Sequence, residues 1–177
     1  MKFKLSTKIT ERDYLEFNVF LATRAPYGKK QIKVLRIFAA ACFAIISVIS
    51  LIGKSYTAIL AYVAGCGLVQ LLIKPGYKWL VKRNMESMIK SGKSLFSPES
   101  EIEFFDEGFA ETTAENRTEY KYSAVERVSV VEGRMIYIHL NSVTAYIIPI
   151  ASFESSEQVG AFLEFIREKC QAVDVYS

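Results

Sequence analysis

Few residues of this chain have the type and spacing that chemistry requires. The single histidine, His139, lies in a segment with the alternating pattern of a β-strand, and no second ligand or catalytic partner is near it in the sequence. Such a histidine is typical of a hydrogen-bonding role inside a sheet. The chain also has no glycine-rich phosphate loop, no HExxH and no GxSxG motif. We therefore expect no enzymatic activity, no catalytic residue and no cofactor.

Acidic and sulfur-containing side chains do not form a recognisable site either. The carboxylates between Glu99 and Glu119 have the spacing of the solvent-facing side of strands, with a cation site as the alternative. The three cysteines, Cys42, Cys66 and Cys170, have neither metal-ligand nor redox spacing. We interpret them as small buried apolar residues and expect no metal centre.

Basic and aromatic residues do form a pattern, because they flank two long apolar segments. We predict that these residues form a membrane interface: Lys29, Lys30, Lys33, Arg36, Lys74, Tyr77, Lys78, Trp79, Lys82 and Arg83. Lysine and arginine are enriched on the cytoplasmic side of membrane helices, and tyrosine and tryptophan are enriched at the headgroup level. The basic residues lack the stacking aromatics of nucleic-acid binders, so we expect no nucleic-acid partner.

The apolar segments, residues 37–52 and 56–73, contain no charged residue, and only Gly53, Lys54 and Ser55 separate them. With its flanks, each reaches the roughly 20 residues that a helix needs to cross a bilayer. We therefore predict a transmembrane helical hairpin over residues 34–73. The alternative is a helical hairpin buried in a soluble core, but the segments lack a polar face and the chain is too short to bury them.

Charge is distributed very unevenly along the chain. Residues 1–94 contain sixteen Lys and Arg and four acids, whereas residues 95–177 contain six basic residues and fifteen acids. Because the loop between the apolar segments carries only Lys54, the hairpin is predicted to have both termini in the cytoplasm. Small residues four positions apart indicate close helix packing, either within the hairpin or in a homo-oligomer: Ala40 with Ala44, and Ala61 with Gly65.

Two short regions flank the hairpin. Residues 1–33 are predicted to contain an N-terminal strand over residues 2–6 and a juxtamembrane helix that begins at Thr10. We expect the strand to join the sheet of the C-terminal region at its edge, with its lysines facing acidic neighbours. Residues 74–96 are predicted to form a basic juxtamembrane helix and a linker, with the helix either lying on the bilayer surface or extending the second span.

Residues 97–177 change to the period of two that is typical of strands. Strands are predicted at residues 101–104, 109–114, 118–122, 127–131, 135–140 and 143–148, and a helix capped by Ser155 or Ser156 follows to about Cys170. An antiparallel sheet closed by one C-terminal helix is the order of a pleckstrin-homology-like domain. The predicted fold is therefore that of an α+β membrane protein, a two-helix hairpin plus a small sheet domain.

Several stretches carry a resemblance to a known family. They are residues 9–14, 119–128, 137–138, 145–149 and 153–158, together with the paired apolar segments. In these stretches the chain resembles the bacterial YcxB-like family, although relatives often have Trp where this chain has Tyr122. The resemblance implies a small two-span protein of the bacterial cytoplasmic membrane with a cytoplasmic C-terminal domain, and it implies no catalytic residues.

We expect from these observations a membrane-anchored, non-enzymatic module whose cytoplasmic domain binds a protein partner. The acidic charge of residues 97–177 argues against binding of that domain to anionic lipid. The alternative is a protein of envelope stress or bacteriocin immunity, in which the hairpin itself acts at the bilayer.

Overall fold

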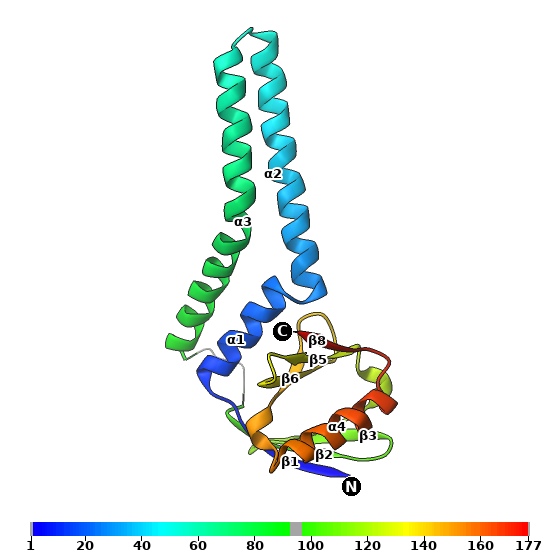
Figure 1. The fold of residues 1–177 in the computed structure, drawn as a ribbon. Helices are drawn as coiled ribbons and strands as arrows, with labels where there is room; N and C mark the ends of the chain where they lie inside the picture. Colours follow the sequence, from blue (N-terminus) through cyan, green and yellow to red (C-terminus); the bar gives the residue numbers. More distant parts are fainter. Residues whose placement is uncertain (1, 93–96, 177) are drawn as a thin grey trace. The chain divides into compact units, whose positions relative to one another are not determined.

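A computed structural model describes residues 2–92 and 97–176, and the chain divides into two compact units. The sandwich unit combines residues 1–14 with residues 94–177, and the helical unit consists of residues 15–93. Figure 1 shows the long helices of the helical unit and the strands of the sandwich unit. The predicted domain boundaries placed residues 1–33 in one segment, whereas here their first strand belongs with the C-terminal region.

The sandwich unit contains two four-stranded sheets. The N-terminal sheet is antiparallel and has the order β1 (Phe3–Lys8), β2 (Glu99–Phe104), β3 (Gly108–Thr112), β4 (Arg117–Lys121). The C-terminal sheet has the order β7 (Ala145–Pro149), β6 (Met135–His139), β5 (Arg127–Val131), β8 (Val173–Tyr176). Its β5 and β8 run parallel, and its other pairs are antiparallel.

The prediction that the first strand joins the C-terminal region is confirmed. Strand β1 pairs with β2 over six residues, from Phe3 opposite Phe104 to Lys8 opposite Glu99, and forms the edge of the N-terminal sheet. On the outer face the Lys4 amine lies 2.7 Å from a carboxylate oxygen of Glu101. The alternation of β1 therefore places its lysines against acids and its apolar residues in the core.

The core lies between the sheets and is closed by helix α4 (Ser156–Lys169). Ser155 caps this helix as predicted, because its hydroxyl accepts a hydrogen bond from the backbone N–H of Gln158 at 3.2 Å. The fully buried Phe162 ring packs edge-on against Phe3 and Phe104, with ring centroids 5.4 and 4.8 Å apart. Aromatic contacts of this geometry link the helix to β1 and β2.

Several details of the sandwich unit differ from the prediction. The strand predicted at residues 143–148 begins at Ala145, because the Asn141 side chain accepts hydrogen bonds from the backbone N–H groups of Val143 and Thr144 and holds a turn there. Two short 3₁₀ turns, η1 (Tyr122–Ala124) and η2 (Ile150–Ser152), follow β4 and β7. Strand β8 was not predicted at all.

The helical unit consists of the rest of α1 (Glu11–Thr23), α2 (Pro26–Ile52) and α3 (Tyr56–Lys90). Helix α1 begins as predicted: the hydroxyl of Thr10 accepts from the N–H of Asp13, and the Asp13 carboxylate accepts from the N–H of Thr10. Helix α2 begins earlier than expected, at Pro26, since proline is well suited to the first helical position. Part of the predicted linker, residues 93–96, lies outside the described residues.

Candidate membrane interface

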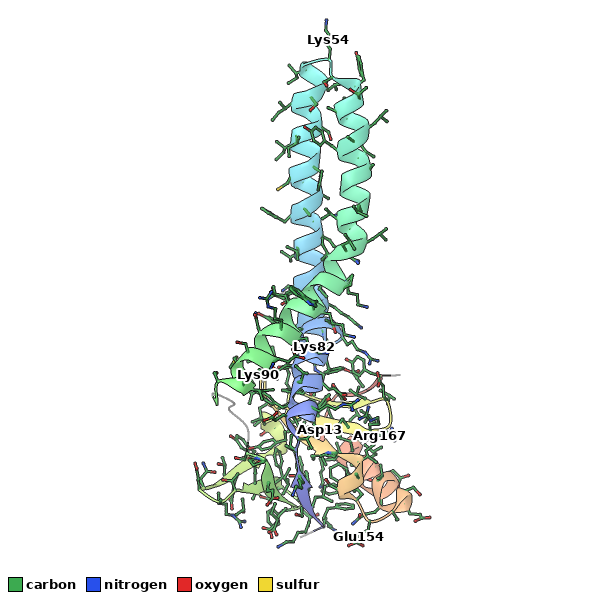
Figure 2. The ribbon with its side chains drawn as sticks, turned by 90° about the vertical axis from the view of Figure 1, so that its left-hand side faces the viewer. Asp13, Lys54, Lys82, Lys90, Glu154 and Arg167 are labelled. Atoms are coloured by element: carbon green, nitrogen blue, oxygen red, sulfur yellow. The ribbon has the colours of Figure 1, made fainter. Side chains whose placement is uncertain are left out.

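Both long helices expose apolar side chains along their middle sections. In the most apolar 18-residue stretch of each helix, no residue is buried. Phe38 and Leu71 keep 67% and 74% of their surface exposed, and Figure 2 shows side chains projecting from both helices up to Lys54 in the connecting loop. Soluble proteins rarely leave such a continuous apolar surface uncovered. Helices α2 and α3 are long and apolar enough to span a membrane.

The two helices pack in an antiparallel register that two contacts define. The side-chain amide of Gln70 donates a hydrogen bond to the carbonyl oxygen of Arg36, with an N···O distance of 2.9 Å. Further along, Gly65 lies against the Phe43 ring, where an added Cβ would be 3.4 Å from Cε1. In two antiparallel helices, the numbers of residues that face each other add up to a nearly constant sum. Here the sums are 106 and 108, as expected for a hairpin with a short connection.

This register brings predicted interface residues of both helices to the same end of the hairpin. Lys33 of α2 comes level with Lys74 of α3, by the same residue-number total. The predicted basic residues are all exposed, and we call them the basic collar: Lys29, Lys30, Lys33, Arg36, Lys74, Lys78, Lys82 and Arg83. The opposite end of the hairpin carries only Lys54. The hairpin therefore has one strongly basic end and one weakly basic end.

The aromatic residues of the predicted interface lie in the same part of α3. Tyr77 is half-buried, whereas Trp79 is exposed and its ring centroid lies 5.2 Å from the guanidinium carbon of Arg83. Helix α3 contains Pro75 and bends away from α2 in its C-terminal half (Figure 1), as an internal proline causes. An exposed indole beside a cation suits a headgroup region, where one side of the ring is apolar and the other is wet.

Three polar side chains within the apolar segments, Ser47, Ser50 and Gln70, have hydrogen-bond partners inside the hairpin. The hydroxyls of Ser47 and Ser50 donate to the carbonyl oxygens of Phe43 and Ile46, at 2.8 and 3.0 Å. Together with the bond made by Gln70, these contacts satisfy groups that would otherwise be costly in hydrocarbon.

One of the predicted small residues, Gly65, makes a close helix contact within the hairpin. Ala40, Ala44 and Ala61 are exposed, and the close helix contact is made at Gly65. Side chains at Ala40 and Ala44 lie on the surface of α2, since the half-buried positions of that helix around them are Ala39 and Phe43.

In the sandwich unit, a half-buried carboxylate connects the two sheets. Glu111 of β3 accepts hydrogen bonds from the side chains of Ser100 and Tyr146, while its partial burial raises its pKa. The Ser100 hydroxyl also lies 2.9 Å from that of Thr7 in β1. This polar cluster was missed from the sequence, although the two-residue spacing of Glu111 from the buried Phe109 places both side chains on the inner face.

Comparison with protein families identifies this region. Residues 104–166, from the last residue of β2 into α4, match the family described as YcxB-like protein. The sandwich unit is similar to this family over residues 104–166, and we call the whole unit the YcxB-like domain because of that similarity. The match confirms the predicted resemblance over these residues and does not extend to β1, β8 or the long helices. No curated protein and no solved structure matches the chain in the comparisons made.

The YcxB-like domain holds His139 inside its C-terminal sheet. Nε2 of His139 lies 3.1 Å from the hydroxyl oxygen of Ser129 on the neighbouring strand, and both residues are almost completely buried. Burial and the charge of Arg127 together lower the pKa of His139 from 6.5 to about 4, while Asp174 opposes this effect. The ring is therefore neutral at pH 7, and its hydrogen bond joins β5 to β6.

Several acids of the N-terminal sheet form ion pairs on its outer face. Glu103 of β2 lies between Lys4 and Arg117, with N···O distances of 3.3 and 3.4 Å. Within residues 2–92 and 97–176, no three His, Cys, Asp or Glu side chains come together in a way that could hold a metal ion. Tyr122, at the position of the expected Trp, is buried and donates a hydrogen bond to the carbonyl of Phe105 at 2.9 Å.

Proposed function

We propose that this chain is a non-enzymatic adaptor of the bacterial cytoplasmic membrane, anchored by the α2–α3 hairpin and binding a protein partner through its YcxB-like domain. The anchoring is supported by the uncovered apolar surface of both helices and by the internal hydrogen bonds of Ser47, Ser50 and Gln70. The basic collar supports contact between that end of the hairpin and anionic lipid headgroups.

The pairing of β1 with β2 carries the proposed topology. Residues 3–8 precede both long helices and residues 99–104 follow them, yet the two segments form one six-residue ladder. Two strands of one sheet must lie on the same side of a bilayer. If α2 crosses the membrane, α3 must cross it back, so the chain is a two-pass protein with both flanks on one side.

The basic collar then indicates on which side of the membrane the flanks of the hairpin lie. The flanks of the hairpin carry all eight residues of the collar, whereas the loop carries Lys54 alone. An excess of Lys and Arg marks the cytoplasmic side. The YcxB-like domain and both termini are therefore cytoplasmic in this proposal.

The architecture and charge of the domain support binding of a protein rather than lipid. We infer that sheets β1–β4 and β5–β7 followed by α4 form a pleckstrin-homology-like fold, in which β1 comes from before the hairpin in the sequence. The sandwich unit contains ten basic and seventeen acidic residues, a net charge of −7. A surface of this charge is repelled by anionic lipid.

Sidedness can be tested with single cysteines in a chain in which Cys42, Cys66 and Cys170 are changed to alanine. In intact cells, a membrane-impermeant maleimide should label Lys54→Cys in the loop, while Glu107→Cys in the β2–β3 turn should react only after lysis. Release of the chain from membranes by carbonate, or labelling of Glu107→Cys in intact cells, would contradict the proposal.

The partner can be tested by crosslinking the full chain in native membranes. A specific partner should be captured by the parent chain and lost in Phe104→Asp, which places a charge at a completely buried core position. Equal capture by both chains would assign the contact to the hairpin and refute the role of the domain.

A further inference from the structure

Strand β5 is one of the two inner strands of the C-terminal sheet, with β6 on one side and β8 on the other. Four of its five residues are buried. Its edge toward β8 is closed by backbone hydrogen bonds, which include N–H of Val128 to the carbonyl of Ala172 at 2.8 Å and N–H of Glu132 to the carbonyl of Tyr176 at 2.7 Å. Without β8, this edge of an apolar strand would present unpaired backbone groups.

Strand β8 is attached to β5 with little side-chain burial. It has four residues, none of them is buried, and Val175 is 69% exposed. Its pairing with β5 is the parallel one in the sheet, which is slightly less stable per residue than antiparallel pairing. A short strand with little side-chain burial is the kind of element that opens locally without unfolding of the domain.

The other sheet edges of the domain have features that block strand addition. Strand β1 carries Lys4 and Lys8, and β4 carries Arg117 and Lys121 at its two ends. Strand β7 ends at Pro149, which has no backbone N–H to donate. Charged residues and proline are the usual protection of edges, and β5 is protected only by β8.

We propose that β8 is an exchangeable strand and that the edge of β5 is the docking site for an extended segment of the protein partner. This inference rests on the proposed adaptor function and adds the place and the mode of binding. The incoming segment adds to the sheet in parallel to β5, as peptides do in β-strand addition.

The side chains of β8 define the chemistry of that segment. Val173 packs against the domain core. On the other face, the Tyr176 hydroxyl is hydrogen-bonded to the side chains of Ser129 and Arg127, and the Asp174 carboxylate lies 3.5 Å from the same hydroxyl. A competing segment should therefore alternate apolar, acidic, apolar and aromatic residues, as residues 173–176 do.

Proline substitutions can open the edge selectively. In a parallel ladder the amides of alternate residues point to the partner strand, so the N–H of Asp174 faces β5 and that of Val175 points away. Asp174→Pro should release β8, whereas Val175→Pro should leave it paired, and Asp174→Asn controls for loss of the carboxylate. The probe is a fluorescent peptide of residues 171–177, QAVDVYS, with a scrambled peptide as control.

With the full chain in detergent, the peptide should bind Asp174→Pro at least tenfold more tightly than the parent, Val175→Pro or Asp174→Asn. Independently of any variant, hydrogen exchange in the parent should show β8 amides opening faster than those of β6. No peptide binding to a folded Asp174→Pro chain, or exchange of β8 only together with β6, would overturn the inference.

Crosslinking separates this inference from the adaptor function. A natural partner whose crosslinks map to α4 or to the N-terminal sheet would leave the adaptor function intact and overturn the docking site. Peptide binding to the opened edge in a chain that captures no partner from membranes would support the exchangeable strand and refute the adaptor function.

Discussion

Leu5 should contribute as much to the stability of the YcxB-like domain as core residues that follow the long helices. It lies opposite Ile102 in the β1–β2 ladder, is 1% exposed and belongs to the core cluster. Truncation of a buried leucine to alanine costs about 3 kcal/mol through lost apolar contacts and the cavity left behind. Leu5→Ala should therefore raise the population of the opened domain about 100-fold.

Cys170 offers a reporter that senses this domain and not the hairpin. Its thiol is buried in the core cluster, and burial raises its pKa, so it reacts only when the domain opens. In a chain with Cys42→Ala and Cys66→Ala, the rate of Cys170 labelling by a thiol reagent should be about 100-fold faster for Leu5→Ala. Lys4→Ala is the matched control, because its exposed ion pairs on the outer face should add little.

One combination of Cys170 labelling rates would contradict a contribution of β1 to the core. Ile136→Ala, at a completely buried position of β6, should accelerate labelling of Cys170 to a similar extent as Leu5→Ala. If Ile136→Ala accelerates labelling and Leu5→Ala does not, β1 contributes nothing to the core, and the same-side argument for the hairpin loses its basis.

Three further predictions concern single side chains. Gly108→Ala should destabilise the domain by about 2 kcal/mol in urea unfolding, because an added Cβ would meet the backbone of β4, whereas Gly160→Ala in α4 has open space and should be neutral or stabilising. The native pKa of His139 is about 4 against 6.5 for the free side chain, so the unfolded chain takes up the proton first as pH falls. Stability should decline by up to about 3 kcal/mol between pH 6.5 and pH 4, and His139→Gln should remove that part of the decline in urea titrations at several pH values. Gln70→Leu should weaken the hairpin by about 1 kcal/mol in a helix-dissociation assay in detergent, and Thr57→Val, at an exposed position, should not.

Local patterns in the sequence were sufficient for the hairpin and for most strands. The uncharged runs at residues 37–52 and 56–73 predicted the apolar parts of α2 and α3, although both helices extend beyond these runs, and alternation in residues 2–6 and 101–104 predicted which side chains face inward. Opposite charges on the outward faces of these two strands also predicted that they pair. The β1–β2 ladder confirms this pairing, although the two strands are far apart in the sequence. The hairpin and the inward-facing side chains could be predicted because each pattern is contained in a short stretch of the sequence.

Features that depend on the assembled sheets were not predictable in the same way. Residues 173–176 alternate but are too short to distinguish a strand from a tail until β5 offers an edge. The polar role of Glu111 depends on Tyr146 arriving from β7. Among the small residues, the choice of Gly65 as the close contact depends on the rotation of both helices, which spacing alone does not determine.

The split of the YcxB-like domain around the hairpin connects its folding to the proposed topology. Strand β1 is synthesised before α2 and α3, while its partner β2 follows them, so the N-terminal sheet closes only when both segments lie on one side of the membrane. An arrangement with a single crossing would leave the core without Leu5 and would expose the edge of β2 next to Ile102. Loss of that burial disfavours the single-crossing arrangement by several kcal/mol. In the proposed topology, the position of β1 in the sequence would therefore favour the two-pass arrangement from outside the bilayer, in addition to the apolar segments themselves.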